Sequence, residues 1–137
     1  MKISVVIPLY NKRNCISEAL NSVFNQSYTD FEVLVVDDGS TDDSLEVVRE
    51  FSDKRLRIIE KTNSGVSATR NAGIAAAANE WIAFLDADDI WTSFHLETLV
   101  KLHEKFPNAE VLCSNYEKFT SDENYIDKLE TIEQKMN

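Results

Sequence analysis

The sequence predicts an α/β fold, with a mostly parallel sheet and helices on both faces. Short apolar segments rich in β-branched residues alternate with segments of helical periodicity from the first residues onward. Residues 3–7 are apolar at nearly every position, which is typical of a parallel strand buried on both faces. Strands that alternate with helices favour parallel pairing through helical crossovers.

The first strand and helix are expected close to the N-terminus. Residues 3–7 are almost entirely apolar, and Pro8 ends this strand because proline has no backbone N–H to donate. Ile16, Leu20 and Val23 then recur at the spacing of one helix face.

The second strand is expected at residues 31–36. Residues 40–43 offer capping oxygens and acids for a first helical turn, and Leu45, Val48 and Phe51 form an apolar stripe behind them.

The remaining elements continue the alternation. Residues 56–60 and 81–85 predict the third and fourth strands. The alanine-rich residues 67–78 between them predict a helix that packs closely on the sheet, because its side chains are small. A last helix is expected over residues 96–106, where Pro107 terminates it.

One domain is expected. We assign residues 1–117 to the α/β domain, in which residues 110–114 fit a fifth strand. Residues 118–137 are polar with a thin apolar stripe, and we expect a C-terminal tail that is either a loosely docked helix or the start of a longer segment.

Composition narrows the function classes. The formal net charge of −10 and the lack of a basic patch argue against a direct role on DNA or RNA. The two cysteines belong to no CxxC or Cys/His cluster, so a disulfide framework or zinc site is not indicated. No secretion signal or membrane span is visible. We expect a cytoplasmic protein, and association with the cytoplasmic face of a membrane through parts outside this sequence stays open.

Polar clusters follow three of the expected strands, at residues 8–11, 37–40 and 86–89. In open α/β sheets, ligands bind outside the carboxyl ends of the strands. Convergence of three separated segments is harder to obtain by chance than any single motif. The sequence therefore predicts a ligand site at this edge of the sheet.

The pair Asp86 and Asp88 is the first candidate for chemistry. On extended backbone, residues two apart point the same way, so both carboxylates can face one ligand. Like charges brought together favour a cation between them, and Mg²⁺ or Mn²⁺ prefers carboxylate oxygen. The alternative is a solvated acidic loop that caps the next helix.

The cluster of Asp37, Asp38, Gly39 and Ser40 also has two interpretations. One is a tight strand-to-helix turn that uses the backbone freedom of Gly39 and the hydroxyl of Ser40 as a cap. The other adds ligand binding, because a turn needs one carboxylate and the second can accept a hydrogen bond from a nucleobase.

Three further polar residues are candidates. Tyr10 offers an aromatic face to a flat ring, and Asn11 a helix cap. Arg70 lies near the start of an otherwise uncharged helix, where the interpretation is open between a solvated side chain and a partner for an anion or a base.

Taken together, these segments resemble the family 2 inverting glycosyltransferases of the GT-A fold. The resemblance covers about residues 1–115, with the motifs in the family's order and spacing. The matching segments are residues 4–11, 35–42, 65–73 and 84–89.

The resemblance implies roles for individual positions. Pro8 and Tyr10 would line the nucleoside pocket, with Tyr10 against uracil. Asp38 would accept a hydrogen bond from the base, and Arg70 would lie against the base or nearby. Asp86 would contact the ribose or nucleotide side.

The resemblance also implies a metal and a reaction. Asp88 would bind a divalent cation, Mg²⁺ or Mn²⁺, on the diphosphate of the donor. The family transfers a sugar from a nucleotide-diphosphate donor to a saccharide or lipid-linked acceptor by single displacement, in which a carboxylate base deprotonates the acceptor hydroxyl. That base comes from a later segment in the family and is not identifiable here, so we expect weak or absent activity from this chain alone.

Other classes fit less well. A dinucleotide-dependent oxidoreductase would need a G-x-G-x-x-G turn after the first strand, where residues 8–12 contain no glycine. A receiver-like signalling domain would need a lysine after a late strand, for which Lys118 is the one candidate. The main alternative is a non-catalytic domain that binds a nucleotide sugar or another protein.

Overall fold

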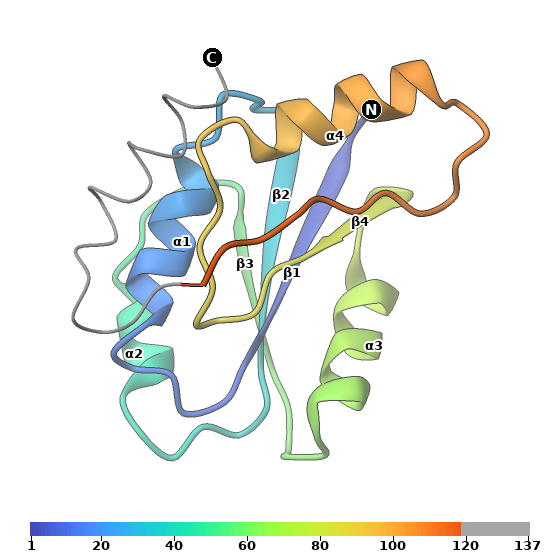
Figure 1. Ribbon diagram of the computed structural model, residues 1–137. Helices are drawn as coiled ribbons and strands as arrows, with labels where there is room; N and C mark the ends of the chain where they lie inside the picture. Colours follow the sequence, from blue (N-terminus) through green and yellow to red (C-terminus); the bar gives the residue numbers. More distant parts are fainter. Residues whose placement is uncertain (119–137) are drawn as a thin grey trace.

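The computed structural model of the chain describes residues 1–118. It contains four strands and four helices that alternate along the chain (Figure 1). The strands are β1 (Ile3–Leu9), β2 (Phe31–Asp37), β3 (Leu56–Glu60) and β4 (Trp81–Phe84). The helices are α1 (Ile16–Phe24), α2 (Ser44–Arg49), α3 (Val66–Ala76) and α4 (His95–Lys105).

The strands form one parallel sheet in the order β3-β2-β1-β4. Helices α1, α2 and α4 supply the apolar residues that pack on one face, and α3 packs on the other face. Figure 1 shows α3 on the side of the sheet opposite α1 and α2. The predicted α/β architecture, with helices on both faces, is confirmed.

Strands β1 and β2 form the centre of the core. Alternate residues of both strands point to opposite faces, and both sets are buried. This explains the continuous apolar runs in the sequence, because neither face of these strands meets water.

Pro8 lies inside β1 rather than after it. The pairing of β1 with β4 ends at Val6, opposite Phe84, whereas Pro8 still pairs with Val36 of β2. Successive residues of a strand direct their backbone groups to alternate sides, and the Leu9 carbonyl accepts from Asp38 on the β2 side. The nitrogen of Pro8 therefore faces β4, beyond the last residue pair between β1 and β4. Because no hydrogen bond between these strands is due there, the missing N–H of proline costs none.

Helix α3 lies very close to the sheet. A Cβ atom added at Gly73 would be 2.3 Å from Val6 Cγ1 and 3.3 Å from Val36 Cγ2. The alanine-rich sequence correctly predicts this close packing. The helix ends at Ala76, two residues earlier than expected, because Ala77 has an extended backbone with ψ at 136°.

The expected fifth strand at residues 110–114 is wrong, since these residues have no strand structure and are mostly exposed. An apolar stretch becomes a strand only where a partner completes its hydrogen bonds, and none of the four strands pairs with this one. Of the expected tail, residues 119–137 lie outside the described part of the chain. Within the described part, no helix is long and apolar enough to cross a membrane.

The segment between β4 and α4 is tied to the end of α1. Gln26 is 4% exposed; its amide nitrogen donates to the Thr92 carbonyl at 2.6 Å, and its amide oxygen accepts from the Leu96 N–H at 2.9 Å. The Trp91 N–H donates to Ser22 Oγ at 3.1 Å. These contacts fix the chain just beyond the acidic cluster at residues 86–89.

Candidate functional site

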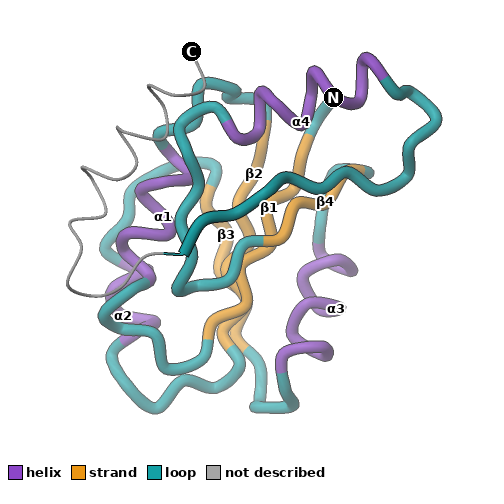
Figure 2. The backbone as a smooth tube through the Cα atoms, in the orientation of Figure 1, coloured by secondary structure: helices purple, strands orange, loops and turns teal. Residues whose placement is uncertain are grey.

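A cleft of about 450 Å³ lies at the carboxyl ends of the four strands. The loops that follow β1, β2 and β3 reach the same edge of the sheet, at the lower end in Figure 2. The residues that line the cleft come from the ends of strands, the loops after them and the start of α3: Pro8, Leu9, Tyr10, Lys12, Asp38, Asn63, Gly65, Val66, Thr69, Asp86, Ala87 and Asp88. Five of the six residues assigned from the sequence are among them: Pro8, Tyr10, Asp38, Asp86 and Asp88.

The loop after β1 is fastened to the loop after β2. The side-chain oxygen of Asn11 accepts hydrogen bonds from the Thr41 N–H at 2.8 Å and the Asp42 N–H at 3.2 Å. The Asn11 N–H donates to Ser40 Oγ at 3.1 Å. The expectation that Asn11 caps a helix is wrong, because α1 begins only at Ile16 and the Asn11 amide instead joins two loops of the site.

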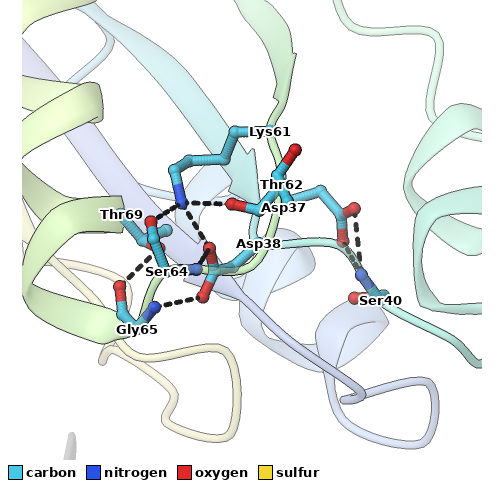
Figure 3. Close-up of polar contacts among 8 residues, drawn as sticks. All are labelled: Asp37, Asp38, Ser40, Lys61, Thr62, Ser64, Gly65 and Thr69. Carbon is cyan, nitrogen blue, oxygen red and sulfur yellow. Dashed lines mark hydrogen bonds and ion pairs between the residues drawn. The ribbon is translucent and has the colours of Figure 1, made fainter.

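The two carboxylates that end β2 have different partners. Both oxygens of Asp37 accept from the Ser40 N–H, at 3.3 and 3.2 Å, which closes the turn in which Gly39 has φ at +73°. Asp38 turns instead toward the loop between β3 and α3 (Figure 3). Asp37 therefore closes the strand-to-helix turn, as the first interpretation predicts. The carboxylate of Asp38 lines the cleft instead.

Asp38 is 4% exposed and is the most enclosed carboxylate in the cleft. Its Oδ1 accepts from the Ser64 N–H at 2.9 Å and from Lys61 Nζ, and its Oδ2 accepts from the Gly65 N–H at 2.9 Å (Figure 3). Burial alone would raise the pKa of Asp38, but the hydrogen bonds from Lys61, Ser64 and Gly65 outweigh it and lower the pKa from 3.8 to about 2. Asp38 is therefore a fixed negative charge that holds the β3–α3 loop against the end of β2.

Tyr10 is the exposed aromatic ring of the site. The residue is 46% exposed and lies at the cleft directly after β1, with the half-buried Pro8 beside it. An accessible aromatic face bordered by apolar carbon is suited to stacking on a flat ligand ring.

Asp86 and Arg70 form an ion pair at the other side of the cleft. Arg70 Nη2 donates to Asp86 Oδ1 at 2.6 Å, with the two side chains 36% and 46% exposed. Arg70 does not line the cleft itself, unlike the other predicted residues, and its buried Nε has no hydrogen-bond partner in the structure. Arg70 thus reaches the site through Asp86, a carboxylate that does line the cleft.

Asp88 is paired with a lysine. Lys12 Nζ lies 2.6 Å from Asp88 Oδ2, with the side chains 42% and 45% exposed. The hydrogen bond and charge of Lys12 lower the pKa of Asp88 despite the opposing effect of burial. At the neighbouring Asp89, burial and then the charges of Asp88 and Asp86 raise the pKa.

The surroundings of Asp88 fit a divalent cation. Its carboxylate is accessible from the cleft and already holds a positively charged group. The described residues contain no group of three or more ligands that would enclose an ion. Mg²⁺ is commonly held in this open way, by one or two carboxylates together with substrate phosphates and water.

Sequence reasoning missed part of the site. The cleft is also lined by Lys12 and by two residues of the β3–α3 loop, Asn63 and Gly65. The sequence pattern assigned no role in the site to these residues. A signal for the loop was available, because β3 is parallel to its neighbours and its carboxyl end must reach the same edge of the sheet. The partners of Lys12 depend on side-chain directions that no sequence pattern encodes.

The fold and the cleft define an open parallel α/β domain with a cleft suited to a ligand at the carboxyl ends of its strands. Comparison with known proteins narrows this class. The model of glycosyl transferase family 2 matches residues 4–136. The chain belongs to this family.

Relatives and solved structures agree with this assignment. The glycosyltransferase GlyA of Streptococcus pneumoniae serotype 4 is 39% identical over 124 residues, which cover 89% of this chain and 18% of GlyA. Residues 1–349 of TarS from S. aureus, solved in complex with UDP-GlcNAc, match 77% of this chain and 32% of that one, with 36% identity and a TM-score of 0.72.

A third similar protein is the mannosyltransferase PcManGT from Pyrobaculum calidifontis, solved in complex with GDP-Man and Mn²⁺. It matches with 31% identity and a TM-score of 0.62, over 66% of this chain and 28% of that chain. The chain thus spans no more than about a third of the length of these three proteins. The GT-A fold expected from the sequence is the fold of these structural neighbours.

Proposed function

We propose that the protein transfers a sugar from a nucleotide-diphosphate donor, with UDP as its nucleotide, to a hydroxyl of a saccharide or lipid-linked acceptor, with inversion at the anomeric carbon. One observation carries the proposal: five residues assigned to a donor site from three separated segments line a single cleft. Membership of glycosyl transferase family 2 supports the same reaction class.

The nucleoside end of the donor is assigned to the side of the cleft formed by β1 and β2. Tyr10 stacks on the uracil ring, Pro8 borders it, and Asp38 accepts a hydrogen bond from the base N–H. The choice of UDP rests on TarS, whose UDP-GlcNAc complex has higher identity and TM-score to this chain than the GDP-Man complex of PcManGT.

The diphosphate is assigned to the side formed by the loop after β4. Asp88 holds Mg²⁺ or Mn²⁺ there, and the Mn²⁺ complex of PcManGT supports this role. Such an ion, when bound, offsets the negative charge that builds on the leaving diphosphate. Asp86, oriented by Arg70, accepts hydrogen bonds from the ribose or the nucleotide.

The cleft's own carboxylates are assigned to binding rather than to proton abstraction. Each is engaged by a cation: Asp38 by Lys61, Asp86 by Arg70 and Asp88 by Lys12. A general base must reach the acceptor hydroxyl and be free to take its proton. We therefore assign the base of an inverting displacement to none of these three residues.

Calorimetric titration of UDP, with and without Mn²⁺, tests the donor site. Wild-type chain is expected to bind UDP more tightly with Mn²⁺, and Asp88→Asn is expected to lose at least about tenfold in affinity in the presence of the metal, because a neutral amide is a poorer ligand for a hard cation.

The matched control is Asp30→Asn, at an exposed aspartate before β2, at the opposite end of the sheet. This variant should bind as wild type does. Metal-dependent UDP binding that survives unchanged in Asp88→Asn would remove Asp88 from the metal site. A folded wild-type chain that binds no UDP would contradict the donor site as a whole.

A further inference from the structure

Lys12 is the one cation among the described residues that line the cleft, together with the carboxylates of Asp38, Asp86 and Asp88, and its ammonium group contacts Asp88. Asp38 and Asp86 are balanced by Lys61 and Arg70, neither of which lines the cleft. In the described structure Asp88 pairs with no basic side chain from outside the cleft, and it pairs instead with Lys12. The charge balance at the metal-binding end of the cleft therefore depends on a side chain that itself faces the ligand.

The main chain of Lys12 is fixed while its ammonium group is accessible. The Lys12 N–H donates to Ser44 Oγ at 2.8 Å, and its carbonyl accepts from the N–H groups of Cys15 and Ile16, both at 3.0 Å, at the start of α1. The side chain is 42% exposed and ends on Asp88. An anchored backbone with a long flexible side chain allows the charge to move without a movement of the loop.

We propose that Lys12 is the counter-ion of Asp88 while the site is empty, and that it passes to an oxygen of the donor diphosphate when a divalent cation replaces it on Asp88. This inference rests on the proposed function and adds Lys12 to the residues that bind the donor. The ammonium group of Lys12 pairs with Asp88 before the metal binds and with the donor diphosphate afterwards.

The exchange follows from charge. An ammonium group and a divalent cation repel each other, so they do not share one carboxylate oxygen. An ion pair as exposed as that of Lys12 and Asp88 adds little to stability, so its replacement costs little. The incoming ion brings the diphosphate with it, and a displaced ammonium beside that diphosphate gains a charge-assisted hydrogen bond to a phosphate oxygen.

Mn²⁺ binding in the absence of nucleotide tests the first half of the proposal. Free Mn²⁺ is counted by electron paramagnetic resonance during titration of wild type and of Lys12→Met. The variant is expected to bind Mn²⁺ about threefold more tightly, because the metal no longer competes with an ammonium group. The gain should vanish in the double variant Lys12→Met, Asp88→Asn, which lacks the carboxylate that both cations use.

UDP binding at saturating Mn²⁺ tests the second half. Lys12→Met should bind UDP about tenfold more weakly, while Lys12→Arg, which keeps the charge, should recover most of the loss. The matched control is Lys2→Met, an exposed lysine at the other end of β1, which should leave both affinities and the thermal midpoint unchanged.

The two measurements separate the possible failures. Mn²⁺ affinity that is equal in wild type and Lys12→Met, or binding that is absent from both, overturns the exchange at Asp88. Unchanged UDP affinity in Lys12→Met overturns the diphosphate contact. A third outcome is that Lys12→Met binds Mn²⁺ more tightly than wild type, while the wild-type chain binds no UDP. That result contradicts the proposed function and the diphosphate contact, but the competition between Lys12 and the metal at Asp88 stands.

Discussion

Asp38 shows how one residue can be both buried and ionised. A carboxylate that is 4% exposed loses most of its hydration, which by itself favours the neutral acid. Here the lost water is replaced by two backbone N–H groups, of Ser64 and Gly65, and by the ammonium of Lys61. These donors belong to the loop that forms one wall of the cleft, so the same contacts that keep Asp38 charged also place that wall.

The pH dependence of stability follows from this arrangement. The folded-state pKa of Asp38, about 2, lies below its ordinary value of 3.8. Its contribution to the free energy of unfolding is therefore fully present above pH 3.8 and is lost as the pH falls toward 2. Asp38→Asn should cost about 2 kcal/mol at neutral pH, and the difference from wild type should narrow across this range.

Urea unfolding at several pH values between 6 and 2 measures this difference. Asp30→Asn, at an exposed site, is the reference for the loss of one acidic charge, and its difference from wild type should stay small throughout. A gap between wild type and Asp38→Asn that is the same at pH 6 and at pH 2 would show that the ionised form of Asp38 is not favoured by folding.

At the scale of elements, the sequence predicts those features that depend on a local pattern of residues, such as the position of a strand. Short segments that are wholly or mostly apolar locate all four strands, and the small residues of α3 predict its close approach to the sheet. The fifth strand at residues 110–114 could not be judged in this way, because a strand exists only through its partner. Asn11 illustrates a similar limit: the sequence suggests a local helix cap, whereas its amide binds a loop 30 residues further along the chain.

The contact between α3 and β1 leaves no room for a side chain at Gly73. In Gly73→Ala the new Cβ would meet Val6 Cγ1 at 2.3 Å, and Val6 is fully buried in a central strand. Alanine favours a helix over glycine by about 1 kcal/mol, but overpacking typically costs about 1–3 kcal/mol. We expect Gly73→Ala to lower the free energy of unfolding in a urea titration.

A double-mutant cycle with Val6→Ala identifies the cause. Val6→Ala removes the methyl groups that the new Cβ would meet, so the double variant should be more stable than the sum of the two single losses predicts. Losses that simply add would show that Gly73→Ala acts on the helix itself rather than on its packing against β1.

At the scale of the whole molecule, topology is what makes the site partly predictable. Parallel strands in the order β3-β2-β1-β4 bring every strand end to one edge, so residues far apart in sequence such as Tyr10, Asp38 and Asp88 line one cleft. The topology does not determine which charged side chains form ion pairs in the cleft. The partners Lys12, Lys61 and Arg70 reach their carboxylates through flexible side chains, and they decide the electrostatics of the cleft.

The net charge of −10 adds a long-range field to these local pairs. An acidic molecule attracts Mn²⁺ and repels UDP, and salt weakens both effects, since the screening length falls from about 30 Å at 0.01 M to about 10 Å at 0.1 M. Raising NaCl over this range should therefore weaken Mn²⁺ binding and strengthen UDP binding measured without metal, each by about twofold to fivefold. Uridine, which is uncharged, serves as the control and should bind with the same affinity at both salt concentrations. UDP affinity that falls as salt rises would mean that Lys12 and the other cations near the cleft outweigh the field of the whole chain, and that the donor is drawn to the site before any metal binds.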